Sequence, residues 1–185
     1  MKNLILASAS PRRHELLSLL EIPFKTFSSD IDETISPNTA PEEAVQQLAL
    51  KKAQAAIETH PNSIIIGCDT IVVHNGNILG KPADKADAFH VLSQLSNHTH
   101  TVYTGVSIIS EDVNKVFYEK TEVTFWELSD QDIEAYIDSG EPMDKAGSYG
   151  IQGKAALFVK EIHGDYYSVV GLPISRLARE LSFFR

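Results

Sequence analysis

Near its start the chain carries LILASASPRR (residues 4–13), the stretch that decides how the fold begins. The apolar residues 4–7 predict a strand, and the leucines at 16, 17, 19 and 20 follow helical spacing. Between them, Ser10 is of a type that caps helices, and Pro11 suits the first helical position. The segment therefore predicts a strand, a hydroxyl-rich turn and a helix in succession.

This turn gathers groups that bind anions. Backbone N–H groups and the hydroxyls of Ser8 and Ser10 converge where the helix dipole is positive. The guanidinium groups of Arg12 and Arg13 follow within the first helical turn, so the place suits a phosphate. The same residues would also serve an ordinary capped helix with two solvated arginines, and the segment alone leaves both interpretations open.

Length and composition favour one globular domain over residues 1–185. A single cysteine, Cys68, excludes an internal disulfide framework and suits a reducing compartment. The sequence shows no signal peptide and no apolar run long enough to cross a membrane. We therefore expect a cytoplasmic protein without membrane contact.

The charge balance bears on the partners. A formal net charge of −9 argues against binding to a nucleic-acid backbone. Cations are nevertheless clustered at Arg12-Arg13, at Lys51-Lys52 and at Lys81, so a local pocket for one polyphosphate remains compatible with the acidic whole.

Helical and strand patterns alternate along the rest of the chain, which predicts an α/β fold with a mixed sheet. Thr39 and Glu42 form a capping-box pattern for a helix that runs to about residue 58. Further helices are expected over 84–96, from 129 to 140 and from 173 onward. Strands are expected over 24–28, 63–73, 99–110 and 115–125, with a hairpin turn at 75–76. A glycine-rich loop spans 146–153, and residues 156–162 and 166–170 read as a second hairpin.

Asp69 is the carboxylate most suggestive of chemistry. It follows an apolar strand, and a charge there is costly unless it is paired or binds a metal. Glu33 is a plausible second carboxylate, although Asp30 and Asp32 in the same acidic turn compete with it. Two carboxylates with phosphate oxygens suit Mg²⁺ or Mn²⁺. A structural ion pair at Asp69 and a solvated acidic turn are the alternatives.

Lys81 lies between a glycine and a proline, an arrangement that can hold one ammonium against a phosphate. A surface lysine is the simpler interpretation, and the same applies to Lys52. The sequence has neither a Walker-type phosphate loop nor a dinucleotide fingerprint, and it shows no nucleophile elbow.

The ordered set of motifs resembles the Maf family of nucleotide pyrophosphatases, which are also known as septum-formation inhibitors. The matching blocks span nearly the whole chain: LILASASPRR at 4–13, Asp32-Glu33, LALKKA at 48–53, GCDT at 67–70, GKP at 80–82, PMDKAGSYGIQG at 142–153 and GDYYSVVGLP at 164–173. Each block alone is modestly specific, whereas the ordered set is highly specific.

The resemblance implies an elongated mixed sheet with flanking helices and two lobes around a deep cleft, similar to inosine-triphosphate pyrophosphatases. It also implies hydrolysis of nucleoside triphosphates to the monophosphate and pyrophosphate. Asp69 matches the family's catalytic base, which would share a divalent cation, Mg²⁺ or Mn²⁺, with Glu33. The other matching positions are Ser8, Ser10, Arg12, Arg13, Lys52 and Lys81 in the polar cleft, and Gln152 in the base-side loop. A homodimer is a further family expectation.

Three positions indicate the subgroup that acts on dTTP and UTP: Arg12, Thr70 and Gln152. A glutamine amide can pair with the carbonyl and N3–H edge that thymine and uracil share, whereas cytosine reverses this pattern. Gln152 could instead merely tie down its loop. Two other functions stay open, a 7-methyl-GTP pyrophosphatase and a nucleotide-sensing division-arrest factor that acts through protein contacts.

Overall fold

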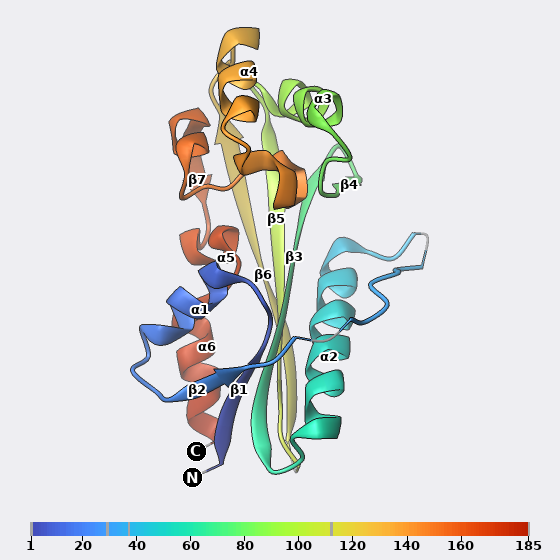
Figure 1. Cartoon of the computed structure of the whole chain (residues 1–185), viewed down its shortest axis with the longest axis vertical. Helices are drawn as coiled ribbons and strands as arrows, with labels where there is room; N and C mark the ends of the chain where they lie inside the picture. The colour runs from blue at the N-terminus through green and yellow to red at the C-terminus, as the bar shows by residue number, and fades with distance from the viewer. Residues whose placement is uncertain (1, 29, 37, 112, 185) are drawn as a thin grey trace. The chain divides into compact units, whose positions relative to one another are not determined.

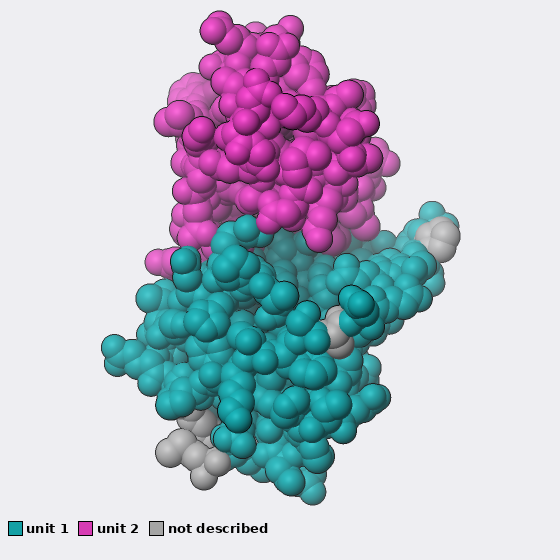
Figure 2. Space-filling model, viewed as in Figure 1, with its two compact units in different colours: residues 1–70, 104–119, 171–185 teal, residues 71–103, 120–170 magenta. Residues whose placement is uncertain are grey.

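The computed structural model describes residues 2–28, 30–36, 38–111 and 113–184, and it divides into two compact units. Unit 1 comprises Met1–Thr70, Thr104–Glu119 and Gly171–Arg185, and unit 2 comprises Ile71–Tyr103 and Lys120–Val170 (Figure 2). Three of the four boundaries between them fall inside long strands, so three strands contribute residues to both units, and the fourth follows residue 170 at the end of a short helix. The single domain expected over 1–185 stays a prediction.

The described residues form a seven-stranded mixed sheet (Figure 1). The strands are β1 (Asn3–Ala7), β2 (Phe24–Thr26), β3 (Ser63–His74), β4 (Asn77–Leu79), β5 (Thr99–Ile109), β6 (Asn114–Phe125) and β7 (Val159–His163). Their order is β2-β1-β3-β5-β6-β7, with β4 paired to β3. β1 runs parallel to β2 and β3, whereas the β3–β4 and β6–β7 pairs are antiparallel. The predicted mixed α/β fold is confirmed, and the deep cleft stays a prediction.

Six α-helices accompany the sheet in the described part of the chain. They are α1 (Pro11–Ser18), α2 (Pro41–Thr59), α3 (Lys85–Leu95), α4 (Asp130–Asp138), α5 (Tyr166–Val170) and α6 (Ile174–Leu181). Short 3-10 turns occupy Glu141–Asp144 (η1), Ala146–Ser148 (η2), Lys154–Phe158 (η3) and Ser182–Phe184 (η4). The caps expected at Ser10 and at Ser129 with Asp132 are present, and Asp84 caps α3.

In unit 1, α2 packs directly on the backbone of the sheet. A Cβ atom at Gly67 would lie 2.1 Å from the carbonyl oxygen of Ala49, and one at Gly105 would lie 2.3 Å from that of Val45. Only glycine permits this approach, because any side chain would push the helix away. Since alternate residues of a strand share a face, Asp69 lies on the same face of β3 as Gly67, beneath α2.

Unit 2 has an aromatic core. Phe125 contacts the rings of Tyr149 and Phe158 at centroid distances of 4.8 and 6.0 Å, and Tyr136 packs on Phe158 at 5.2 Å. Edge-to-face packing of this kind adds to the burial of apolar area. The core lies under the loop predicted over residues 146–153, which contains Tyr149.

Two local predictions are wrong. Helix α2 is capped by Ala40 without a side-chain bond, because Pro41 takes the first helical position and the Thr39 hydroxyl donates to the Ser36 carbonyl instead. Residues 166–170 form helix α5 rather than the second strand of a hairpin. There the Asp165 carboxylate accepts from the backbone N–H of Ser168 at 2.8 Å, so a local cap overrides the strand preference of the valines and tyrosines.

Candidate active site

The turn after β1 folds as its sequence predicts. The Ser10 hydroxyl accepts from the backbone N–H of Arg13 at 3.5 Å, and Pro11 begins α1. The Ser8 hydroxyl accepts from the backbone N–H of Ser10 at 3.2 Å. Both serines therefore hold the turn rigid, and Arg12 sits half-buried at the second position of α1.

Arg13 is anchored by neutral oxygens at all three of its nitrogens. Nε donates to the carbonyl of Gly171 at 2.9 Å, and Nη1 and Nη2 donate to the hydroxyls of Ser8 and Thr70 at 3.2 Å each. Within the described ranges no carboxylate pairs with Arg13, so its positive charge is fixed in place without being cancelled. Such a preorganised cation suits an anionic ligand.

Lys52 bridges the two predicted carboxylates. Its Nζ lies 2.5 Å from Oδ1 of Asp69 and 2.9 Å from Oε1 of Glu33. Burial of the ammonium lowers the pKa of Lys52, but attraction and hydrogen bonding to Asp69 and Glu33 outweigh it, so the pKa lies above its ordinary 10.5. Lys52 is therefore a cation at neutral pH.

The structure also selects among the carboxylates of the acidic turn. Asp32 accepts from the backbone N–H of Thr34 at 2.9 Å, and these local bonds lower the pKa of Asp32. Lys51 donates to the carbonyls of the same turn at 3.2 and 3.4 Å. Asp32 is thus a turn residue, and Glu33 alone of the three competing carboxylates pairs with Lys52.

Asp69 and Thr70 lie beyond the end of the neighbouring strand. The last residue of β1, Ala7, pairs with Gly67, so β3 continues for several residues past β1. Carboxyl ends of parallel strands are a common place for ligands because no partner strand covers the next residues. Asp69 faces α2, whereas Thr70 lies on the opposite face of β3 and bonds to Arg13.

Arg13 is supported by two buried residues that the sequence analysis did not identify, Gly171 and Thr104. Gly171 has φ +128°, a conformation that favours glycine, and its carbonyl accepts from both Arg13 and the Cys68 thiol, the latter at 3.0 Å. Thr104, fully buried on β5, bonds to Thr70 at 2.8 Å. Cys68 itself is buried, and burial raises the pKa of its thiol.

Unit 2 brings the remaining two predicted residues into neighbouring segments. The backbone N–H of Gly147 donates to the carbonyl of Gly80 at 3.0 Å, which ties the glycine-rich loop to the segment of Lys81. Lys81 and Gln152 are both exposed on these segments. Eight of the predicted site residues therefore lie in unit 1 and these two lie in unit 2.

Neutral hydrogen bonds hold the loop of Gln152. The Tyr149 hydroxyl lies 2.7 Å from Nε2 of His100, and the backbone N–H of Gly150 donates to the Tyr136 hydroxyl at 3.1 Å. Burial lowers the pKa of His100 to about 3 and raises the pKa of Tyr149, so both side chains are neutral at physiological pH. Gln152 thus lies on a loop whose backbone is held by the buried side chains of Tyr136 and Tyr149.

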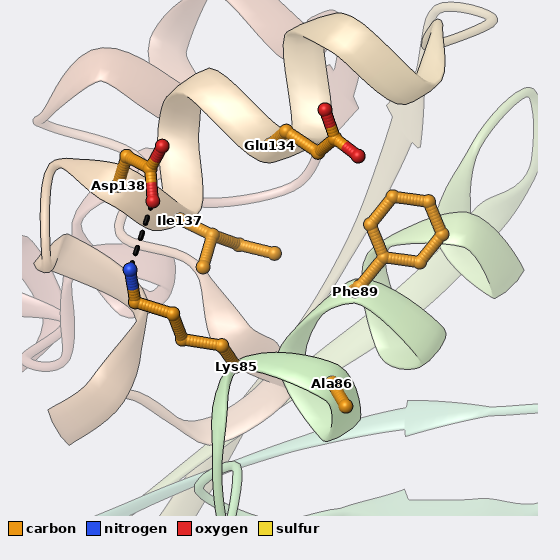
Figure 3. Close-up of a pocket in the computed structure, with 6 residues that line it drawn as sticks. All are labelled: Lys85, Ala86, Phe89, Glu134, Ile137 and Asp138. Carbon is orange, nitrogen blue, oxygen red and sulfur yellow. Dashed lines mark hydrogen bonds and ion pairs between the residues drawn. The ribbon is translucent and has the colours of Figure 1, made fainter.

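A surface hollow elsewhere in unit 2 contains none of the predicted residues. It measures about 320 Å³ and lies between α3 and α4 (Figure 3). Phe89 and Ile137 form its apolar wall, and a Lys85–Asp138 ion pair of 2.8 Å crosses its rim. No cluster of polar groups converges on it, so it is a poor candidate for chemistry.

Comparisons with known proteins agree on one family. The model of the Maf-like protein family matches residues 3–184. A dTTP/UTP pyrophosphatase of Bacillus cytotoxicus is 57% identical over 184 residues, which cover 100% of this chain and 96% of that protein. One from Bacillus anthracis is 56% identical over the same shares.

Solved structures agree at the level of the fold. A HAM1 protein from Coxiella burnetii aligns with a TM-score of 0.57 at 16% identity, covering 98% of this chain and 99% of that chain. The Ham1 protein of Staphylococcus aureus aligns with a TM-score of 0.50 at 16% identity, over 67% and 72%. None of the described helices is long and apolar enough to cross a membrane. From the family model and the two full-length relatives, the chain belongs to the Maf-like protein family.

Proposed function

We propose that this protein hydrolyses nucleoside triphosphates between the α- and β-phosphates, with dTTP and UTP as its preferred common substrates. Two features of unit 1 carry the proposal. Arg13 is held by neutral groups, so its charge is available to a phosphate, and the Lys52–Asp69 ion pair lies just beyond the end of β1. Relatives that match the whole chain are named dTTP/UTP pyrophosphatases, which supports the same substrates.

The triphosphate would bind at the turn after β1. The N-terminus of α1 and the hydroxyls of Ser8 and Ser10 suit phosphate oxygens, and Arg13 is already oriented by three bonds. Arg12, Lys52 and Lys81 add positive charge. As the α–β bond breaks, charge moves to the departing pyrophosphate, and fixed cations stabilise it without having to reorganise.

Asp69 is the proposed general base. It is 8% exposed, lies in β3 just beyond the end of β1 and is held by Lys52 rather than by a bond that would consume both of its oxygens. A carboxylate so fixed can orient a water and accept its proton as the water attacks the α-phosphorus. No covalent nucleophile is required, so the mechanism is a direct displacement by water.

A divalent cation, Mg²⁺ or Mn²⁺, is part of the proposal. Glu33 and Asp69 converge on one ammonium, and such a pair of hard oxygen donors, completed by phosphate oxygens, fits either ion. Among the described residues no cluster of three His, Cys, Asp or Glu side chains could hold a metal, so phosphate oxygens must supply part of the ligand set. When bound, the cation would neutralise phosphate charge and assist the attacking water.

Base selection is assigned to Gln152. Its side chain is exposed on a loop whose backbone is fixed by Tyr136 and Tyr149, so the amide can meet a ligand with little loss of loop entropy. The amide matches the edge shared by thymine and uracil. Arg12 is proposed to support this selectivity. Thr70, whose hydroxyl bonds to Arg13, is proposed to support it as well.

A turnover screen tests the proposal. Specificity constants are measured for dTTP, UTP, CTP, GTP and 7-methyl-GTP with Mg²⁺ or Mn²⁺, together with modified uridine triphosphates and a chelator control. Multiple-turnover release of pyrophosphate, highest for dTTP and UTP, is the expected result. Preference for 7-methyl-GTP would overturn the substrate assignment, and tight binding without turnover would favour a nucleotide sensor. A homodimer in the cytoplasm is also proposed, and light scattering and cell fractionation test it.

A further inference from the structure

We infer that Thr104 is a positioning residue that holds Arg13 in place through the hydroxyl of Thr70. The inference rests on the proposed function in one respect, namely that Arg13 binds phosphate. It assigns a role to a fully buried residue of β5 that is distant in sequence from every motif of the site.

The contacts form a continuous chain. Thr104 Oγ1 lies 2.8 Å from Thr70 Oγ1, and Thr70 Oγ1 accepts from Nη2 of Arg13 at 3.2 Å. Whichever threonine donates in the first bond, that bond fixes the side-chain rotamer of Thr70 and hence the direction of the lone pair that meets Arg13. Thr104 has no exposed surface, so it can act on a ligand only through its neighbours.

The arrangement matters because Thr70 completes the set of bonds that orient the planar guanidinium. Gly171 restrains Nε, Ser8 restrains Nη1 and Thr70 restrains Nη2. All three partners are neutral, and therefore they orient the guanidinium while its charge remains available to a phosphate. Loss of the Thr104 hydroxyl would let Thr70 rotate and would weaken one of the three bonds that orient the guanidinium, although the charge would be unchanged.

The first experiment compares two substitutions at Thr104. Thr104→Val keeps the shape but removes the hydroxyl, whereas Thr104→Ser keeps the hydroxyl. The measurement is the binding of inorganic pyrophosphate by calorimetry. It requires no turnover, and the ligand has no nucleobase. Thr104→Val is expected to weaken this binding about 3–10-fold, as loss of one hydrogen bond between neutral groups does, and Thr104→Ser is expected to stay near wild type. Thr70→Val should reproduce the loss.

Ser107→Ala is the matched control. Ser107 is also fully buried on β5 within unit 1, and its hydroxyl has no hydrogen-bond partner among the described residues. Its removal is expected to leave pyrophosphate binding unchanged. Equal losses in Ser107→Ala and Thr104→Val would mean that any buried hydroxyl of the strand matters, which would overturn the assignment.

A double-mutant cycle with Arg13→Met separates positioning from a general structural effect. If Thr104 acts through Arg13, Thr104→Val weakens pyrophosphate binding in the wild-type background and has no further effect beside Arg13→Met. A loss of the same size in both backgrounds, or no loss in either, overturns the inference. Absence of nucleotide hydrolysis in a wild type that still shows this coupling would reject the proposed function and keep the positioning role.

Discussion

The two groups of predicted residues are built by opposite means. In unit 1 the chain fixes charges: Lys52 holds two carboxylates, and Arg13 is tied at three nitrogens. In unit 2 it fixes a backbone: neutral bonds from Tyr136 and His100 hold a loop whose exposed side chain, Gln152, is left to meet a ligand. Charges that stabilise a changing phosphate need fixed positions, whereas recognition of a base edge needs one well-placed amide. The difference predicts that unit 1 substitutions lower the rate and unit 2 substitutions alter selectivity.

The largest effect is expected from Asp69→Asn. Asparagine keeps the shape but cannot accept a proton, and loss of a positioned base costs on the order of 10²–10⁴ in rate. The measurement is kcat for UTP, with circular dichroism to show that the fold is intact. Asp138→Asn is the matched control, because Asp138 is also an ion-paired aspartate but lies at the α3–α4 hollow of unit 2. Near-normal turnover in folded Asp69→Asn would exclude Asp69 as the base.

The predicted site residues of unit 1 differ in how well the sequence alone identifies them, because some depend on neighbours within a few residues and others on distant contacts. Ser10, Pro11 and the strand before them act within a few residues, so the turn and its cap were predictable from their spacing. Asp69 was also visible, as a charge at the end of an apolar run. The residue pattern by itself did not choose Glu33 over Asp32, because the choice depends on which carboxylate reaches a lysine of α2; only the family resemblance pointed to Glu33.

The supports of the site could not be predicted for a related reason. Gly171 and Thr104 are separated from Arg13 by most of the chain, and their roles exist only once the sheet has formed. A threonine in an apolar strand has no pattern of its own that distinguishes it from a packing residue. The α5 error has the opposite cause, because a short-range cap at Asp165 outweighed residues that usually form strands.

The next effect concerns selectivity and is expected from Gln152→Ala. Removal of the amide should lower the ratio of the specificity constants for UTP and CTP by about 10-fold, since the mismatch that excludes cytosine is lost. The kcat for UTP should change less than it does in Asp69→Asn. Gln131→Ala, an exposed glutamine of α4 in the same unit, serves as the control. An unchanged ratio would reject Gln152 as the residue that reads the base.

A smaller effect is expected in the pH dependence of stability. The pKa of Lys52 is raised in the folded chain above 10.5, so its ion pairs stabilise the fold fully below that pH and are lost as the pH rises through the folded value. The difference in unfolding free energy between wild type and Lys52→Met should be constant from pH 7 to about 10 and shrink above that range. Urea unfolding measures it. A difference that grows with pH would contradict the raised pKa.

The smallest effect on turnover is expected from Tyr149→Phe, which tests whether unit 2 supports its loop by a neutral bond. The change removes the hydroxyl that meets His100 at 2.7 Å and leaves a buried imidazole without this partner, at a cost of about 1–3 kcal/mol in unfolding free energy. Because the pKa of His100 is lowered to about 3, the imidazole stays neutral, and the loss should be the same at pH 6 and pH 8. His100→Phe is the partner variant, and its effect should not add to that of Tyr149→Phe if the two side chains act as a pair.

For Tyr149→Phe we therefore expect a measurable loss of stability, a modest decline in the preference for UTP over CTP, and a kcat for UTP close to that of the wild type. A large fall in kcat with the preference intact would contradict the division between rate in unit 1 and selectivity in unit 2.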